Sequence, residues 1–357
     1  MLAVGLMSGT SIDGVDAALI DTDGVHQIDR LAFLSMPYEP ECADRVRAIL
    51  GRAEVDTEIS AVEQELTLLH AKAVGRLLEN AGVSAKSVDV VGFHGHTIHH
   101  VPACGFTWQI GDGALLATEC GIDVVADCRS ADIAGGGEGA PLAPIFHAAL
   151  MAAFEKPVAV LNIGGVANVT WIGKDDALIA FDTGPGNALI DDWAYKNTGK
   201  PMDRDGAMAR RGDIDVAVLE GMLKTPYLKR MPPKSLDRNE FDTSLAEPLL
   251  VEDGAATLSA FTIGCIKASL DYFPVPPARW VVCGGGRRNP ALMAGLGSAL
   301  GVPVEPMEAL GWDGDAIEAQ AFAYLAVRKL KNLPTSFPET TGVAAPTTGG
   351  ILHSHKA

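Results

Sequence analysis

Residues 5–16 read Gly-Leu-Met-Ser-Gly-Thr-Ser-Ile-Asp-Gly-Val-Asp, and this stretch decides the fold. Apolar residues lead into it and resume after it, with glycine and small hydroxylated residues between, which predicts a β-hairpin with a polar turn. Gly9 and Gly14 let the backbone approach a ligand closely, and Thr10 and Ser11 offer hydroxyl and amide donors. The turn therefore suits an anion such as phosphate, although an ordinary hairpin turn has the same composition.

Two carboxylates, Asp13 and Asp16, stand in the same turn. Beside an anion they need a cation between, and Mg²⁺ held together with phosphate oxygens supplies it. The pattern therefore indicates a magnesium-phosphate site, with Asp13 as the metal ligand.

The composition is that of a globular protein. The chain has 357 residues, of which 48% are hydrophobic and 20% charged, so we expect two domains and no extended disorder. A net charge of −17 argues against nucleic acid or an acidic membrane surface as a partner. An anionic substrate then needs a local pocket of amides, arginine or metal.

Six cysteines are scattered without a C-x-x-C pair, and several stand in apolar runs. They are predicted to be buried free thiols in a reducing compartment. The sequence opens with no apparent signal peptide and contains no apolar run of about 18 residues. We therefore expect a soluble cytoplasmic protein.

The chain alternates strand and helix patterns. A third strand is predicted at residues 26–33, helices at 41–50 and 59–81, and a short apolar strand at 88–93. Strands alternating with helices, with glycine at the strand ends, indicate the α/β class with its chemistry in loops.

Four histidines at positions 94, 96, 99 and 100 follow the strand at 88–93. Alternate imidazoles on one face can bind a metal, but no Asp, Glu or Cys nearby completes a zinc pattern. The other interpretation is a set of hydrogen-bonding loop histidines at the end of a strand, one of which reaches a ligand.

A glycine-rich stretch, residues 135–139, follows Arg129 closely. It is either a hinge or a place where the backbone approaches a ligand, and Arg129 is the cation to clamp a carboxylate or phosphate. A surface Arg–Asp pair before a flexible loop explains the same residues.

The second half repeats the opening pattern. Residues 157–172 again read as an apolar strand, a glycine turn at Gly164 and Gly165, and a second strand, followed by a third strand at 178–181. The two copies lie about 155 residues apart, which indicates an internal duplication. Two such units facing each other across a cleft would present two glycine turns to one polyphosphate.

This duplication, with a further strand-to-glycine turn at residues 281–286, resembles the superfamily of sugar kinases, acetate kinase, actin and the heat-shock chaperone ATPase. More narrowly, five segments resemble the anhydro-N-acetylmuramic acid kinase family. They are residues 5–16, 127–142, the Phe-Asp-Thr-Gly-Pro-Gly-Asn of 181–187, the Pro-Pro-Lys-Ser of 232–235, and 311–323.

The resemblance implies a duplicated actin-like (ribonuclease H-like) α/β fold with an interdomain ATP cleft. It places an N-terminal domain at 1–127 and a C-terminal domain at 128–334, with the tail at 335–357 returning to the first. It also implies ATP-dependent phosphorylation of 1,6-anhydro-N-acetylmuramic acid with hydrolytic ring opening, in peptidoglycan recycling. Mg²⁺ and a homodimer come from the same resemblance.

The site residues follow from the same resemblance. It makes Asp182 the catalytic base and His94, Arg129 and Glu318 ligands of the sugar. The nucleotide-binding residues it implies are Gly9, Thr10, Ser11, Ile12, Asp13, Gly14, Val15, Asp16, Gly164, Gly165, Asn168, Gly284, Gly285 and Gly286. Two departures from the family pattern, Glu138 and His96 where glutamine is expected, affect fine substrate contacts.

Residue chemistry supports Asp182 independently. It follows the apolar strand at 178–181 and precedes a glycine turn, so its carboxylate is expected at a strand end, within reach of a water molecule. A turn-capping aspartate is the plainer interpretation. Likewise, Glu318 is either a sugar ligand or a surface glutamate in the first turn of a capped helix.

Other features remain less specific. Pro232-Pro233-Lys234-Ser235 predicts a rigid turn, and Asn289 before Pro290 predicts a helix N-cap. Arg287 and Arg288, just before it, meet either nucleotide phosphate or solvent.

Three other functions stay open at this point. They are a related sugar kinase without ring opening, an ATP-binding regulatory protein of the actin or chaperone type, and a metal-dependent hydrolase built on the histidines. No P-loop or protein-kinase signature occurs in the sequence.

Overall fold

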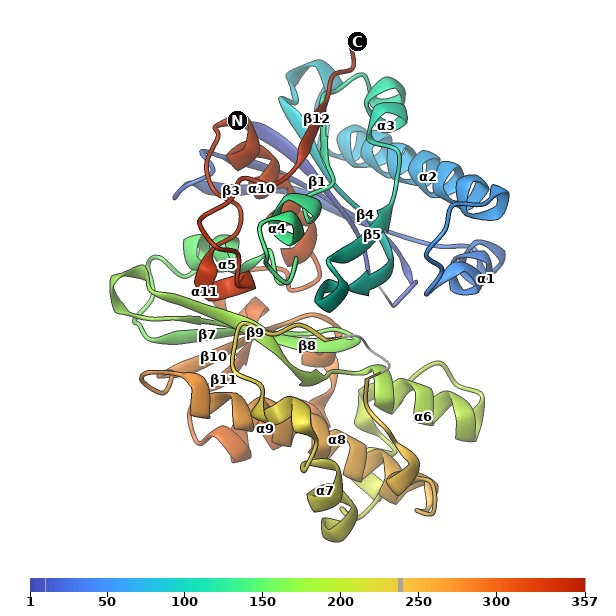
Figure 1. Cartoon of the computed structure of the whole chain (residues 1–357), viewed down its shortest axis with the longest axis vertical. Helices are drawn as coiled ribbons and strands as arrows, with labels where there is room; N and C mark the ends of the chain where they lie inside the picture. The colour runs from blue at the N-terminus through green and yellow to red at the C-terminus, as the bar shows by residue number, and fades with distance from the viewer. Residues whose placement is uncertain (10, 237–239, 357) are drawn as a thin grey trace. The chain divides into compact units, whose positions relative to one another are not determined.

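The computed structural model describes residues 1–9, 11–236 and 240–356. The chain forms two compact units, Met1–Ala152 with Ala316–Ala357, and Ala153–Asp315. The units divide the chain at 152/153 and 315/316, whereas the sequence placed the limits near 127 and 334. The second limit falls earlier than predicted because α10 (Ile317–Leu330) packs on strands of the first unit (Figure 1).

The first unit is built on a seven-stranded sheet in the order β12-β6-β4-β1-β2-β3, with β5 paired to β4. The three opening strands are antiparallel neighbours, and β4 and β6 continue the sheet in parallel beside β1. Its strands are β1 (Leu2–Ser8), β2 (Gly14–Thr22), β3 (Ile28–Pro37), β4 (Val90–Val101), β5 (Phe106–Ile110), β6 (Val124–Ala126) and β12 (Ile351–His353).

The second unit is built on a five-stranded sheet in the order β11-β10-β7-β8-β9. Again three strands form an antiparallel meander, and two parallel strands extend it beside the first of them. Its strands are β7 (Val158–Ile163), β8 (Val166–Ile172), β9 (Leu178–Pro185), β10 (Arg279–Cys283) and β11 (Val304–Pro306).

The order β6-β4-β1-β2-β3 in one sheet matches β11-β10-β7-β8-β9 in the other, strand for strand and direction for direction. This confirms the internal duplication predicted from the two glycine hairpins. The fold is therefore α/β and actin-like, with the same mixed sheet in each unit.

Helices cover both sheets, and their boundaries follow local sequence rules. Asp56 caps α2 by accepting from the amide of Ile59 (2.8 Å), and Gly82 ends it at a φ of 65°. As predicted, Asn289 caps α9, with Pro290 in its first turn. The helices besides α10 are α1 (Pro40–Ile49), α2 (Thr57–Ala81), α3 (Gly113–Cys120), α4 (Ser130–Ala134), α5 (Pro144–Leu150), α6 (Ala188–Thr198), α7 (Val216–Met222), α8 (Val251–Ala268), α9 (Pro290–Leu300) and α11 (Pro338–Thr341).

Helix α10 touches the backbone of the first sheet directly. A Cβ built on Gly5 would lie 1.8 Å from the carbonyl oxygen of Ala319, and one on Gly92 would lie 2.0 Å from that of Phe322. Glycine at these two strand positions therefore sets how closely the helix approaches, and with it the position of every side chain that the helix carries.

Two strands run further than the sequence predicted. β4 continues through the four histidines to Val101, because β5 pairs with it from His96 onward, so these are strand and not loop residues. β9 continues to Pro185, because Gly184 and Pro185 still pair with β8. Asp182 therefore lies inside a strand and not at its end.

Helix α10 begins without the predicted cap. Its N-cap residue is Ala316, and no side chain of the described residues caps the helix. The carboxylate of Asp315, one residue earlier, instead accepts from Arg287 and Arg288.

All six cysteines are free thiols, but not all are buried. Cys42, Cys128, Cys265 and Cys283 are, as expected, whereas Cys120 is half-buried and Cys104 exposed. Over the described residues, no helix combines the length and apolar character that crossing a membrane requires.

Candidate active site

The first glycine turn joins β1 to β2 and is stabilised by its own backbone. The amide of Ile12 donates to the carbonyl oxygen of Gly9 (3.1 Å), with Ile12 at a φ of 56°. The side chains of Ile12 and Val15 are buried in the core. These two residues can therefore offer a ligand only their backbone atoms.

Polar side chains of the same turn reach solvent. Ser11 and Asp13 are exposed, with Ser11 Oγ donating to Asp13 Oδ1 (2.9 Å), and Asp16 is half-buried at the start of β2. Carboxylates of this kind, together with phosphate oxygens and water, match the ligands that Mg²⁺ takes. Thr10, which belongs to the predicted phosphate turn, lies outside the described residues.

Ser8, just before this turn, is held by two partners. Its Oγ lies 2.6 Å from Tyr38 Oη and 2.7 Å from His96 Nδ1. Burial lowers the pKa of His96 to about 4, so the ring is neutral. His96, one of the two departures from the family pattern, therefore fixes the end of β1 from inside the fold.

The second glycine turn joins β7 to β8. The carbonyl of Gly164 accepts from the amide of Asn187 (2.8 Å), and that of Gly165 accepts from the amide of Gly186 (2.8 Å). Asn168, on β8, stands in register with Asp182 on β9. Within the second unit, the turn and the strand that carries Asp182 are therefore directly bonded.

Glycines in the three predicted nucleotide turns are of two kinds. A Cβ on Gly14, Gly284 or Gly286 would lie 2.3 Å from a protein atom, so the fold itself requires glycine there. At Gly9, Gly164 and Gly285 the nearest atom would be 3.5, 3.5 and 3.8 Å away, an ordinary contact distance.

Packing therefore does not demand glycine at Gly9, Gly164 and Gly285. A Cβ at any of them would meet its nearest neighbour at ordinary van der Waals distance. Glycine at such a position leaves the main chain accessible for close contact with a ligand.

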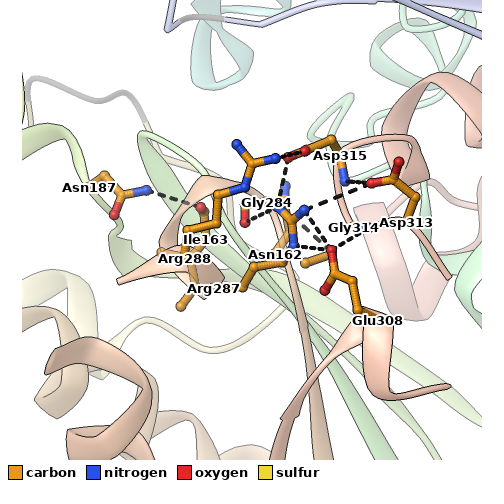
Figure 2. A network of polar contacts seen from close by, with 11 residues as sticks. Asn162, Ile163, Asn187, Gly284, Arg287, Arg288, Glu308, Asp313, Gly314 and Asp315 are labelled. Carbon is orange, nitrogen blue, oxygen red and sulfur yellow. Dashed lines mark hydrogen bonds and ion pairs between the residues drawn. The ribbon is translucent and has the colours of Figure 1, made fainter. Parts of the chain in front are cut away.

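The third glycine turn, Gly284–Gly286, is anchored by Arg287 (Figure 2). The Arg287 side chain is 4% exposed and donates to the carbonyl of Gly284 (3.0 Å), to Asp315 Oδ1 (2.7 Å) and to Glu308 Oε1 (2.8 Å). Burial works against its charge, but the hydrogen bonds to Asp315 and Glu308 raise the pKa of Arg287 above its ordinary value. Arg287 is thus buried and not a solvent-exposed arginine, and it holds the turn.

Replacing Arg287 by lysine should loosen this turn. Lysine keeps the charge but cannot direct three hydrogen bonds in a plane, so we expect R287K to lower the free energy of unfolding by about 2 kcal/mol. We also expect it to raise the KM for ATP, measured by steady-state ADP release. The matched control is R288K, because Arg288 is 67% exposed and pairs with the same Asp315. Equal effects of the two substitutions would contradict the anchoring role.

Asp182 is buried in β9, and its backbone and carboxylate form hydrogen bonds with the segment 227–236 of the second unit. Its amide donates to the carbonyl of Lys234 (3.0 Å), its carbonyl accepts from Tyr227 Oη (2.6 Å), and its Oδ2 accepts from the amide of Leu236 (2.9 Å). The register with β8 shifts at this point, skipping Thr183. Such a bulge turns side chains from their regular alternation and is common beside active sites.

These partners of Asp182 were not predicted from the sequence. The turn at 232–235 was visible as a rigid segment, but nothing in it shows that it pairs with a strand some fifty residues earlier. The signal that could have found Lys234 is a lysine between proline and the apolar Leu236, a poor place for an exposed cation.

In the first unit the structure brings together all three predicted sugar ligands. Arg129 Nη2 donates to His94 Nε2 (2.9 Å), and Arg129 Nη1 donates to the carbonyl of Gly139 (2.7 Å). His94 Nδ1 in turn lies 2.8 Å from the carbonyl of Gly95, so it carries the proton. Burial and the charge of Arg129 lower the pKa of His94 well below its ordinary value, so the imidazole is neutral.

Glu318, in the first turn of α10, completes this group. Burial, with Asp16 nearby, raises its pKa to about 7, and Arg129 partly opposes that rise. The ring of Phe322, one turn further along α10, lies 4.7 Å from that of His94. Glu318 is therefore no surface glutamate, and it shares its surroundings with Arg129, Asp13 and Asp16.

The raised pKa of Glu318 predicts a pH-dependent stability. The folded chain binds this proton more tightly than the unfolded chain, so the stabilisation is present at low pH and is lost as pH rises towards and past 7. We expect the Tm of E318Q to change less between pH 5 and pH 8 than that of the unaltered chain. E339Q, at an exposed glutamate of α11, should show no such difference. Parallel Tm profiles for all three proteins would contradict the assignment.

The histidines of β4 do not assemble a metal site. His99 Nδ1 lies 3.2 Å from the carbonyl of Arg52, and His100 Nδ1 lies 2.9 Å from Thr107 Oγ1. Within residues 1–9, 11–236 and 240–356, no group of three or more His, Cys, Asp or Glu side chains could hold a metal ion. The zinc hydrolase alternative therefore has no ligand set in this part of the chain.

Comparison with known proteins agrees with this fold. The (R)-2-hydroxyglutaryl-CoA dehydratase component A of Acidaminococcus fermentans superposes with a TM-score of 0.50 at 12% identity, covering 93% of this chain and 99% of that one. A likeness at this identity supports the fold alone. The class of protein is thus a two-unit actin-like α/β protein with a glycine turn after the first strand of each sheet.

Sequence relatives are much closer. The family profile described as anhydro-N-acetylmuramic acid kinase matches residues 1–354. Proteins of that name from Rhizorhabdus wittichii and Paramagnetospirillum magneticum are 54% and 52% identical, each covering 99% of both chains. The chain belongs to the anhydro-N-acetylmuramic acid kinase family, and it is a kinase.

Proposed function

We propose that this kinase phosphorylates 1,6-anhydro-N-acetylmuramic acid with ATP while water opens the anhydro ring. The products are N-acetylmuramic acid 6-phosphate and ADP, and the reaction serves cell-wall recycling in the cytoplasm. The observation that carries the proposal is Asp182, a buried residue held by three hydrogen bonds, one of them to its carboxylate, in a chain of this family.

In the proposed reaction Asp182 is the general base. Its carboxylate accepts a proton from water as the water oxygen forms a bond to the anomeric carbon. The bond from that carbon to the bridging oxygen breaks, and this oxygen, which stays on carbon six, forms a bond to the γ-phosphorus of ATP. The bond from the γ-phosphorus to the β–γ bridging oxygen then breaks, and ADP leaves.

We assign the ATP phosphates to the turn of residues 9–16 and to Gly164, Gly165 and Asn168, and the adenosine to Gly284–Gly286. Glycine at positions 9, 164 and 285, where packing alone does not require it, supports this assignment. Asp13, with Asp16 beside it, would hold Mg²⁺, which supplies charge neutralisation at the γ-phosphoryl group when bound. A contribution of Thr10 to phosphate binding stays a prediction.

We assign the sugar to His94, Arg129 and Glu318. Muramic acid carries a carboxylate, and a guanidinium such as that of Arg129 is suited to bind one. The hydrogen bonds to His94 and Gly139 fix the plane of that guanidinium before any ligand arrives. Glu318 can take a sugar hydroxyl, as donor when protonated and as acceptor when ionised.

The test is ADP release from ATP and Mg²⁺ in three parallel reactions: with 1,6-anhydro-N-acetylmuramic acid, with N-acetylmuramic acid, and without sugar. The proposal requires turnover with the anhydro sugar and a phosphorylated, ring-opened product by mass spectrometry. Equal turnover on the open sugar would replace it by a kinase without ring opening. ATP hydrolysis that ignores sugar would favour a regulatory ATPase of the actin type.

The homodimer implied by the family resemblance remains part of the proposal. Multi-angle light scattering of the purified chain should give twice the mass of one chain, 37.3 kDa. A single-chain mass at micromolar concentration would refute the dimer without touching the kinase assignment.

A further inference from the structure

Lys234 is a buried cation that the proposed reaction does not use. The residue is 1% exposed, and its Nζ donates to the carbonyl of Tyr227 at 3.2 Å. Three aromatic rings surround the ammonium, with centroids 4.6 Å away in Tyr272, 4.7 Å in Tyr227 and 5.5 Å in Phe181. This cage stabilises the charge through ring faces, and it fixes where the charge stands.

The cage is joined to Asp182 through the backbone. Phe181 directly precedes Asp182 in β9, the Tyr227 hydroxyl donates to the Asp182 carbonyl, and the Lys234 carbonyl accepts from the Asp182 amide. Leu236, two residues after Lys234, donates its amide to the Asp182 carboxylate. Two of the three rings, those of Phe181 and Tyr227, and the backbone of Lys234 thus directly adjoin Asp182.

Stability alone gives no reason for a lysine here. Burial, with Arg230 nearby, lowers the pKa of Lys234 to about 8, while Cys265 of α8 and Asp182 act in the opposite direction. Burial therefore disfavours the protonated ammonium form of Lys234. Methionine, an unbranched side chain of similar length, would fill an aromatic cage without that opposition.

We propose that Lys234 is a positioning residue for Asp182: its caged ammonium fixes residues 234–236 against β9 and keeps a positive charge beside the carboxylate. The proposal rests on the proposed role of Asp182 as the base. A nearby positive charge favours the ionised carboxylate, which is the form that accepts a proton. Residues 234–236 at the same time orient that carboxylate through the hydrogen bond from the amide of Leu236.

The experiment compares K234M with K229M, because Lys229 is exposed in the same segment. We expect K234M to lower kcat/KM for the anhydro sugar about 10- to 100-fold at pH 7 and to leave the KM for ATP unchanged. The acid limb of its pH profile should move to higher pH, while its Tm stays at or above that of the unaltered chain. K229M should match the unaltered chain throughout.

A second variant, Y227F, removes only the hydroxyl that donates to Asp182 and keeps the cage ring. It should lower kcat without moving the acid limb of the pH profile. The two variants thus distinguish the orientation of the Asp182 carboxylate from the effect of the Lys234 charge on its pKa. If K234M lowers Tm and activity together while the acid limb stays in place, Lys234 is merely structural and the proposal is overturned.

A readout without turnover separates this proposal from the proposed function. The carboxyl ¹³C resonance of Asp182, assigned by its absence in D182N, should titrate at higher pH in K234M than in the unaltered chain. If the unaltered enzyme is inactive but the shift is present, the proposed function is overturned and the effect of Lys234 on Asp182 stands. If the enzyme is active but the shift is absent, the effect of Lys234 on Asp182 is overturned and the proposed function stands.

Discussion

Replacing Asp182 by asparagine should lower kcat by about 10²- to 10⁴-fold, the usual range for removal of a general base. The substitution keeps the shape of the side chain, and its amide oxygen can still accept from the amide of Leu236 (2.9 Å in the unaltered chain). The backbone bonds of Asp182 to Lys234 and Tyr227 are untouched. The loss should therefore come from proton transfer and not from unfolding.

Steady-state ADP release and Tm, measured on the same preparations, test this prediction. D175N is the control, because Asp175 is exposed in the same unit and asparagine tolerates its φ of 59°. We expect D182N to keep its Tm and its KM for ATP, and D175N to keep full activity. Unaltered turnover in D182N would remove Asp182 from the base role, and sugar-independent hydrolysis surviving in it would point to the actin-type alternative.

Local sequence rules could predict most of the fold. The hairpin at Gly9, its copy at Gly164 and the apolar strands around them are written in residues that are neighbours along the chain. Turn chemistry and period-two alternation act over such short distances. The duplication followed from comparing the two halves, and the matching strand orders confirm it.

Strand extension was less predictable, because it depends on pairing partners. The histidines of β4 lack a clear alternation of polar and apolar residues, yet they form a strand because β5 returns alongside them. Asp182 likewise lies within β9 because β8 offers partners up to Val166. In both places a long-range hydrogen-bond ladder, which the local sequence does not show, decided the outcome.

The residues of the candidate site also divide into those with a local sequence signal and those brought together only by long-range packing. Glycine turns and Asp182 carry local signals, whereas Arg129, His94 and Glu318 come from three distant segments and were linked by family resemblance. The contact of Arg129 with His94, and the packing of α10 that buries Glu318 and raises its pKa, join segments far apart in the sequence. The buried role of Arg287 had no local signal, because an arginine in a sequence is expected on the surface. For Lys234 the only local signal was its place between proline and the apolar Leu236.

Gly5→Ala should be the most destabilising single-methyl change in the first unit. The added Cβ would lie 1.8 Å from the carbonyl oxygen of Ala319 and 2.5 Å from the amide nitrogen of Ala323, both backbone atoms of α10. No rotamer change can relieve that clash, so the helix must move off the sheet. We expect a loss of at least about 3 kcal/mol in the free energy of unfolding, at the upper end for overpacking.

Urea denaturation of G5A measures this loss, and G75A is its matched control. Gly75 lies inside α2 with open space around its Cβ position, so alanine there should stabilise the chain by about 0.5–1 kcal/mol through helix propensity. The same added methyl group should therefore lower the free energy of unfolding at Gly5 and raise it at Gly75, because only Gly5 has backbone atoms within contact distance. Because α10 carries Glu318, G5A should also raise the KM for the sugar more than the KM for ATP. A G5A chain as stable as G75A would mean that α10 does not rest on the backbone of β1, and the placement of Glu318 beside Arg129 would fall with it.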